Sequence, residues 1–119
     1  IFLAEHNCLS LRQQRGWTLR DEGEVRVVKV SGGFECNDGA VLHDWVVAGK
    51  GLAWRSLWEV GADIKAGRLV TVLDDFAAPP VGIHAVVPQR RHLPLRVRLF
   101  IDLLKLRWRD AAYWTAGDV

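Results

Sequence analysis

The chain has 119 residues, half of them hydrophobic and a quarter charged, as expected of one ordinary globular domain. A formal net charge of +2 excludes a bulk electrostatic affinity for nucleic acid. Two cysteines without Cys-x-x-Cys spacing exclude a disulfide scaffold and favour reduced thiols in a cytoplasmic protein. The chain starts at Ile1 and contains no Met, so we expect a piece of a longer protein.

The first third of the chain predicts short extended segments separated by turns. Val25, Val27 and Val30 alternate with other residues, as in a strand with one apolar face. Glycine and polar residues interrupt the pattern at each end of the segments. The predicted strands are residues 7–11, 17–19 and 24–30, with breaks at 13–16, 21–23 and 31–33.

The strongest helix-start signal is Asn37-Asp38-Gly39, because either polar side chain can accept hydrogen bonds from the first-turn amides. The pattern then predicts a helix over 40–48, ended by Gly49. A second helix, three short strands and a loop containing Pro79-Pro80 follow. We expect the strands at 51–54, 69–73 and 83–87, the helix at 57–64 and the loop at 74–82.

The last helix is the clearest element. Pro94 suits a first turn, where a missing N–H costs nothing. Apolar residues then recur at steps of three and four, which predicts one apolar face. Strands alternating with helices indicate an α/β layer architecture. The apolar stripe consists of Val97, Phe100, Ile101, Leu104 and Trp108.

Most patterns that could carry chemistry have a simpler interpretation. Gly49-Lys50-Gly51 follows a helix instead of opening one, so it is not a phosphate loop. The four histidines lack metal-ligand spacing. Asp74-Asp75 lies in a loop with prolines and is typical of a solvated turn. Without a nucleophile–base or metal constellation, we expect no enzyme, no metal and no cofactor.

The segment from Phe34 to Gly39 is the one place where a binding function competes with the structural interpretation. A predicted strand ends there and a helix begins, which leaves unpaired amides at the positive end of a helix dipole. Ligands of open α/β sheets bind at the carboxyl ends of strands. An ordinary helix cap explains the same residues equally well.

The order of motifs resembles the effector-binding domain of LysR-type transcriptional regulators. Glu5-His6-Asn7-Cys8-Leu9 is similar to the "His-x-Cys-Leu" strand of that family, and Gly67-Arg68-Leu69-Val70-Thr71-Val72-Leu73 to its "GxLVxVL" strand. No single motif is specific, but five occur in register. The other three are Val28 to Val47, Ala48-Gly49-Lys50-Gly51-Leu52-Ala53, and Arg90 to Asp102.

The resemblance implies an α/β fold of the periplasmic-binding-protein-like (type 2) class, in which one lobe has a mixed sheet flanked by helices. Residues 1–93 would form the second lobe, and 94–119 the terminal helix and tail that return to the other lobe. The family binds its effector between the lobes, where the second lobe contributes a turn. In this sequence that turn supplies Gly33, Phe34, Cys36, Asn37 and Asp38.

One departure from the family pattern concerns Trp54-Arg55, where many relatives have Leu-Pro. A cation there could favour an acidic or aromatic effector, or Arg55 could instead pair with Glu59 at helical spacing. The resemblance further implies a cytoplasmic homo-oligomer whose complete chain binds promoter DNA, whereas this fragment does not. The alternative is a lobe of a periplasmic solute-binding protein.

Overall fold

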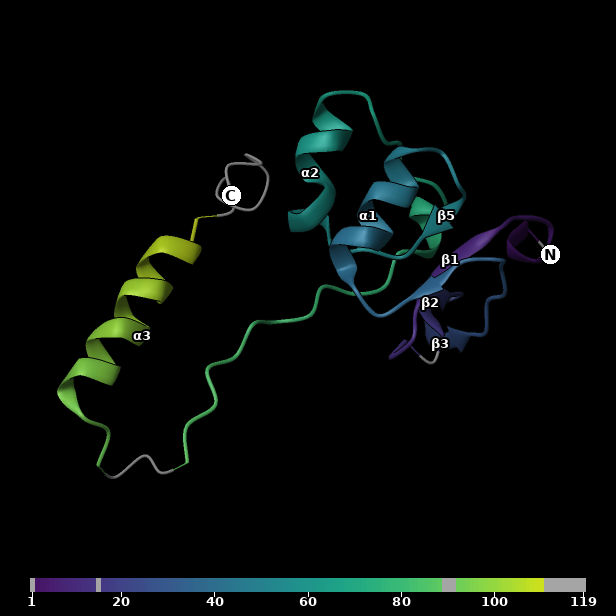
Figure 1. Ribbon diagram of the computed structural model, residues 1–119. Helices are drawn as coiled ribbons and strands as arrows, with labels where there is room; N and C mark the ends of the chain where they lie inside the picture. The colour runs from purple at the N-terminus through teal and green to yellow at the C-terminus, as the bar shows by residue number, and fades with distance from the viewer. Residues whose placement is uncertain (1, 15, 89–91, 111–119) are drawn as a thin grey trace.

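The computed structural model describes residues 2–14, 16–88 and 92–110. The described chain forms a lobe, residues 2–76, and a separate helix at its carboxyl end (Figure 1). The Cα radius of gyration is 17.3 Å, whereas a compact chain of this length has about 13.5 Å. The excess reflects the long connection that carries the last helix away from the lobe.

A three-stranded parallel sheet forms the centre of the lobe. Strand β1 (Cys8–Leu11) lies between β4 (Glu35–Cys36) and β5 (Leu52–Ala53), in the order β4-β1-β5. Ser10 is registered with Glu35, and Cys8 with Leu52. All three carboxyl ends therefore face the same edge of the sheet.

A β-hairpin lies next to this sheet, and its first strand contacts the segment Asp74–Phe76. Strands β2 (Trp17–Asp21) and β3 (Glu24–Val28) pair antiparallel through a two-residue turn. Glu22 and Gly23 both have positive φ, 48° and 85°, as a type I′ turn requires. The predicted turn at 21–23 is confirmed, and β3 ends two residues earlier than expected.

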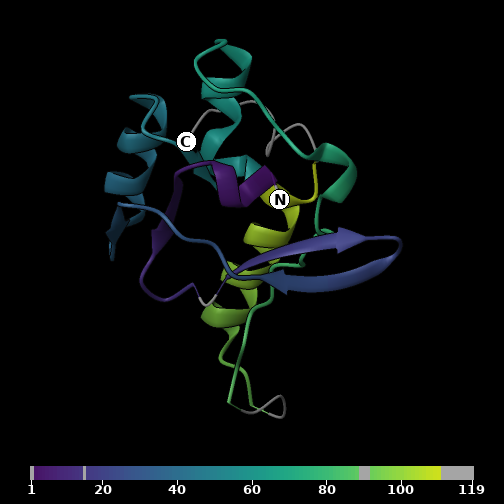
Figure 2. The same ribbon diagram turned by 90° about the vertical axis from the view of Figure 1, so that its right-hand side faces the viewer.

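Two nine-residue helices follow strands of the parallel sheet. Helix α1 (Gly39–Val47) follows β4 and packs on all three strands, and α2 (Leu57–Lys65) follows β5. Both predicted helices are confirmed to within one residue at each end. Figure 2 shows the molecule turned by 90° about the vertical axis, with the hairpin projecting from the lobe.

The buried core is small and is centred on β1 and α1, with further buried residues in β2 and α2. Cys8, Leu9 and Leu42 are completely buried, and Trp17 is 4% exposed. Cys8 and Leu9 belong to the central strand, so β1 is covered on both faces, as is usual in a parallel sheet. Apolar residues of α1 and β1 thus form most of the core.

Two predicted strands are absent from the structure. Residues 69–73 and 83–87 join no sheet among the described residues, and a 3₁₀ turn, η2 (Asp74–Phe76), follows the first. Val70, Ile83 and Val86 are 81%, 63% and 92% exposed. Valine-rich sequence suits a pleated surface, but a strand forms only where a neighbour supplies the hydrogen bonds.

The predicted last helix is α3 (Leu95–Trp108), and Pro94 is its N-cap residue, one position before the first turn in which it was predicted. In Figure 1 it stands apart from the lobe, and none of its residues is buried. Of the predicted stripe, Phe100 is 59% exposed and the other four side chains are half-buried. A second 3₁₀ turn, η1 (Phe2–Glu5), precedes β1.

Candidate functional site

The candidate residues that directly follow strands in the sequence lie at the carboxyl edge of the parallel sheet. Beyond Cys36 come Asn37 and Asp38, and beyond Ala53 come Trp54 and Arg55. Helices α1 and α2 begin at this same edge, so their amino-terminal dipoles lie at one side of the lobe. We refer to Cys36, Asn37, Asp38 and Arg55 as the edge site.

The first turn of α1 is capped by Asp38 and not by Asn37. The Asp38 Oδ1 atom accepts hydrogen bonds from the amides of Ala40 and Val41, at 2.7 and 3.4 Å. This carboxylate places negative charge against the positive end of the helix dipole. The cap interpretation therefore holds for Asp38, while Asn37 remains an exposed side chain beside it.

Arg55 is the most buried polar side chain of the edge site, with 9% of its side chain exposed. Its Nη2 atom lies 2.7 Å from Glu59 Oε1 and 3.5 Å from the carbonyl oxygen of Gly39. Arg55 therefore forms the expected pair with Glu59 and also touches the first turn of α1. A guanidinium carries five N–H donors, and among the described residues its buried Nε has no acceptor.

Gly33 and Phe34 lie away from the edge site, before β4 instead of after it. The amide of Gly33 donates to Asn7 Oδ1 at 2.9 Å, and Asn7 Nδ2 donates to the carbonyl of Lys50 at 2.7 Å. Asn7 thereby joins the segments that lead into β1, β4 and β5 at the amino edge of the sheet. Phe34 packs edge-on against Trp45 of α1, with ring centroids 5.3 Å apart.

Cys36 ends β4 and is partly exposed, and its Sγ contacts the carbonyl oxygen of Asp38 at 3.2 Å. Cys8 is buried in β1, and this burial raises the pKa of its thiol. Because Leu11, not Cys8, is registered with Cys36, the two cysteine Cα atoms are about 11 Å apart by strand geometry. This separation exceeds the reach of a disulfide.

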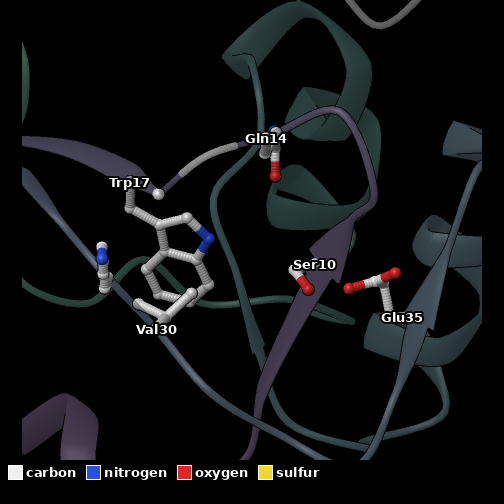
Figure 3. Close-up of a pocket in the computed structure, with 7 residues that line it drawn as sticks. Ser10, Gln14, Trp17, Val30 and Glu35 are labelled. Carbon is white, nitrogen blue, oxygen red and sulfur yellow. The ribbon is translucent and has the colours of Figure 1, made fainter.

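A feature that the sequence did not indicate is a hollow of about 210 Å³ between the parallel sheet and the hairpin (Figure 3). Its lining combines polar side chains with the indole of Trp17. The residues concerned lie on four separate segments, so no local motif could reveal it. They are Ser10, Gln14, Gly16, Trp17, Lys29, Val30 and Glu35.

The described residues contain no group of three His, Cys, Asp or Glu side chains that could hold a metal ion. Within the same residues, no helix combines the length and the apolarity needed to cross a membrane. The arrangement at the edge site offers hydrogen-bond donors, an amide and a cation. Such groups bind and orient a polar small molecule.

A parallel α/β lobe with polar groups at its carboxyl edge is typical of a ligand-binding module. The family model "LysR substrate binding domain" matches residues 2–109. The chain therefore belongs to the LysR substrate-binding domain family. This confirms the resemblance drawn from the motifs.

Named relatives agree with this assignment. The chain is 34% identical over 89 residues to the HTH-type transcriptional regulator DmlR of Escherichia coli strain K12, covering 75% of this chain and 29% of DmlR. It is 32% identical over 106 residues to the HTH-type transcriptional activator TtdR of the same strain, covering 86% and 34%. The chain thus spans about a third of the length of these regulators.

Solved structures of the family also share the fold. The regulatory domain of AphB in Vibrio vulnificus superposes with a TM-score of 0.68 at 31% identity, covering 86% of this chain and 52% of that domain. The predicted α/β, periplasmic-binding-protein-like class is confirmed by this similarity. The effector-sensing function expected from the motifs is that of the family.

Proposed function

We propose that the edge site binds the acidic group of a small-molecule effector, and that Arg55 is the residue that receives it. The observation that carries the proposal is the position of Arg55, whose Nη2 reaches both Glu59 and Gly39 while its Nε has no acceptor in the part of the chain that the structure describes. An arginine in this setting can bind a carboxylate through two parallel hydrogen bonds. Asn37 adds an exposed amide at the same edge.

The contacts of Arg55 also support a route by which effector binding is transmitted to the rest of the regulator. Arg55 connects the first turns of α1 and α2 through Gly39 and Glu59. An effector carboxylate that pairs with Arg55 competes with Glu59 for the guanidinium. Binding then changes how α2 is held relative to α1, and the rest of the regulator responds to that change. A ligand shifts such an equilibrium only by its differential affinity for the two arrangements.

The complete regulator, we infer, is a cytoplasmic homo-oligomer that binds promoter DNA through a helix-turn-helix outside this chain. The names of DmlR and TtdR, both HTH-type regulators, support this inference. A periplasmic solute-binding role receives no support from these relatives. With a net charge of only +2, this chain alone should not retard promoter DNA in a gel shift at physiological salt.

The edge site is tested by Arg55→Gln and Asn37→Leu in the complete regulator, with promoter activity measured against effector concentration. Both variants should lose the response and keep operator binding. Arg26→Gln is the matched control, because Arg26 also pairs with a glutamate but lies on the hairpin. Melting curves must accompany the test, since Arg55→Gln removes a buried ion pair. An unchanged dose–response in folded Arg55→Gln would exclude the edge site.

A further inference from the structure

The hollow between β1, β4 and the hairpin is lined by residues of the parallel sheet and by residues of the hairpin and its flanking segments. Ser10 and Glu35 are registered partners on adjacent parallel strands, so their side chains share one face of the sheet. Trp17 and Gln14 close it from the hairpin and the segment before it. Figure 3 shows the Glu35 carboxylate turned toward Ser10, with the Trp17 indole nitrogen and the Gln14 oxygen facing the same space.

Two buried polar atoms in this lining lack partners among the described residues. They are the Trp17 Nε1, a donor, and the Gln14 Oε1, an acceptor. Trp17 is 96% buried as a residue, because only 4% of its surface is exposed. A buried donor or acceptor without a partner costs free energy. Two such atoms directed at one hollow indicate a polar ligand that satisfies both.

Charge makes the ligand chemistry more specific. Glu35 brings a carboxylate to one side, where its Oε1 also accepts from the exposed Arg12 at 3.2 Å. Lys29 brings a positive charge to the lining from the segment after β3. The hollow therefore combines acceptors for a cation, from Glu35 and Gln14, with donors for an anion, from Trp17 and Lys29.

We propose that this hollow, here called the hairpin pocket, is a second binding site, and that it takes a small zwitterion of the free α-amino acid class. The ammonium group would donate to Glu35 and Gln14, and the carboxylate would accept from the Trp17 indole N–H beside Lys29. A hollow of about 210 Å³ admits such a molecule, since a cavity of about 150 Å³ holds benzene. The site shares no residue with the edge site and does not depend on it.

The experiment follows the indole N–H resonance of Trp17 in ¹H–¹⁵N spectra of the 119-residue chain. Trp17→Phe identifies this resonance by its loss, and the fold should stay intact, because the donor removed has no partner among the described residues. Addition of L-serine should shift the Trp17 resonance saturably and leave the indole of the half-exposed Trp58 unchanged. Methylamine and acetate, each carrying one half of the zwitterion, should bind more weakly.

Glu35→Gln tests the role of the negative charge. It should weaken serine binding by about tenfold or more, because it removes the counter-charge of the ammonium. Glu24→Gln is the matched control, since Glu24 is a strand glutamate in an exposed ion pair outside the pocket. If Trp17→Phe does not fold, sequence-specific assignment of the unsubstituted chain supplies the resonance and the Glu35→Gln comparison decides.

Failure of this site and failure of the edge site are distinguishable. Arg55→Gln should leave the serine-induced shift of Trp17 unchanged, whether or not it abolishes the effector response. The proposal is overturned if serine produces no saturable shift of Trp17 in the folded chain. It is equally overturned if acetate or methylamine alone shifts Trp17 as strongly as serine does, or if Glu35→Gln binds serine as tightly as the unsubstituted chain.

Discussion

The Nε2 atom of His43 lies 2.8 Å from Oδ2 of Asp63, and this contact joins the middle of α1 to α2. Asp63 also accepts from Arg68 Nε through its other oxygen, at 2.5 Å. Among the described residues, Asp63 is the charged residue with the lowest exposure of the whole residue, 9%. Both of its oxygens are thus used to hold the two helices and the turn after α2.

The first prediction is that Asp63 makes folding stability dependent on pH in the acid range. The hydrogen bond from Arg68, followed by the charges of Arg68 and His43, holds the pKa of Asp63 below its ordinary value of 3.8. The ionised form is therefore favoured in the folded state. Its contribution is complete above about pH 4 and is lost as the pH falls through the lowered pKa. Urea denaturation of the chain and of Asp63→Asn, at neutral pH and near pH 3, measures this.

At neutral pH Asp63→Asn should be clearly less stable, and the difference should shrink in acid. The exposed Asp44→Asn on α1 is the control and should show little change at either pH. A stability difference for Asp63→Asn that is the same at both pH values would contradict the assignment to its charge.

The second prediction compares adjacent glycines. A Cβ at Gly32 would clash with the carbonyl oxygen of Cys8, whereas a Cβ at Gly33 would meet no atom within 4 Å. Gly32→Ala should therefore lower the free energy of unfolding by about 1–3 kcal/mol, because the segment before β4 must move away from β1. Gly33→Ala should be close to neutral, within about 0.5 kcal/mol. Thermal melting of both variants checks this, and equal melting temperatures would show that the close approach is dispensable.

The third prediction is that neither cysteine acts as a rapid peroxide sensor. Burial raises the pKa of the Cys8 thiol, so little reactive thiolate forms at neutral pH. The offset between β1 and β4 keeps Cys8 too far from Cys36 for a disulfide. Mass spectrometry after mild peroxide treatment should find both thiols largely reduced. Rapid loss of two protons, with a Cys8–Cys36 cross-link, would refute this and require the sheet to open.

The fourth prediction concerns the exposed apolar face of α3. Leu99, Phe100 and Leu103 are 58%, 59% and 53% exposed in the chain. Full burial of one such side chain contributes about 1.5–3 kcal/mol, which favours association over exposure to water. We expect the isolated chain to dimerise through α3 at micromolar concentration, as measured by sedimentation. Phe100→Asp should yield monomers, and a chain that is monomeric without this change would show that α3 needs no partner.

Local signals in the sequence correctly predicted the elements that are formed by residues close together in the sequence. Asn37-Asp38-Gly39 predicted the start of α1, and Asp21-Glu22-Gly23 predicted the turn between β2 and β3, because caps and tight turns are formed by the residues themselves. The prediction for 69–73 and 83–87 was wrong, because a strand depends on a neighbour that the composition does not reveal.

The candidate sites likewise combine features that depend on residues close in the sequence with features that depend on distant segments. Arg55 and Glu59 stand four residues apart, so their pairing could be anticipated from the sequence. The separation of Gly33 from Asn37 could not, because it depends on the two residues of β4 between them being paired with β1. The hairpin pocket was missed for a related reason. Its lining residues come from separate segments, and the lack of partners at Gln14 and Trp17 among the described residues becomes visible only in the folded chain.

The central position of β1 has a consequence for synthesis on the ribosome. β1 is made first, yet both of its hydrogen-bonding neighbours are later segments, and β5 ends only at Ala53. At about 5–20 residues per second, the 42 residues from Leu11 to Ala53 take roughly 2–8 s to add. During that interval Cys8 and Leu9, which are completely buried in the finished lobe, belong to a strand with two open edges. Slow translation through this stretch should therefore increase aggregation, and chaperone binding to nascent chains should concentrate on β1 until β5 emerges.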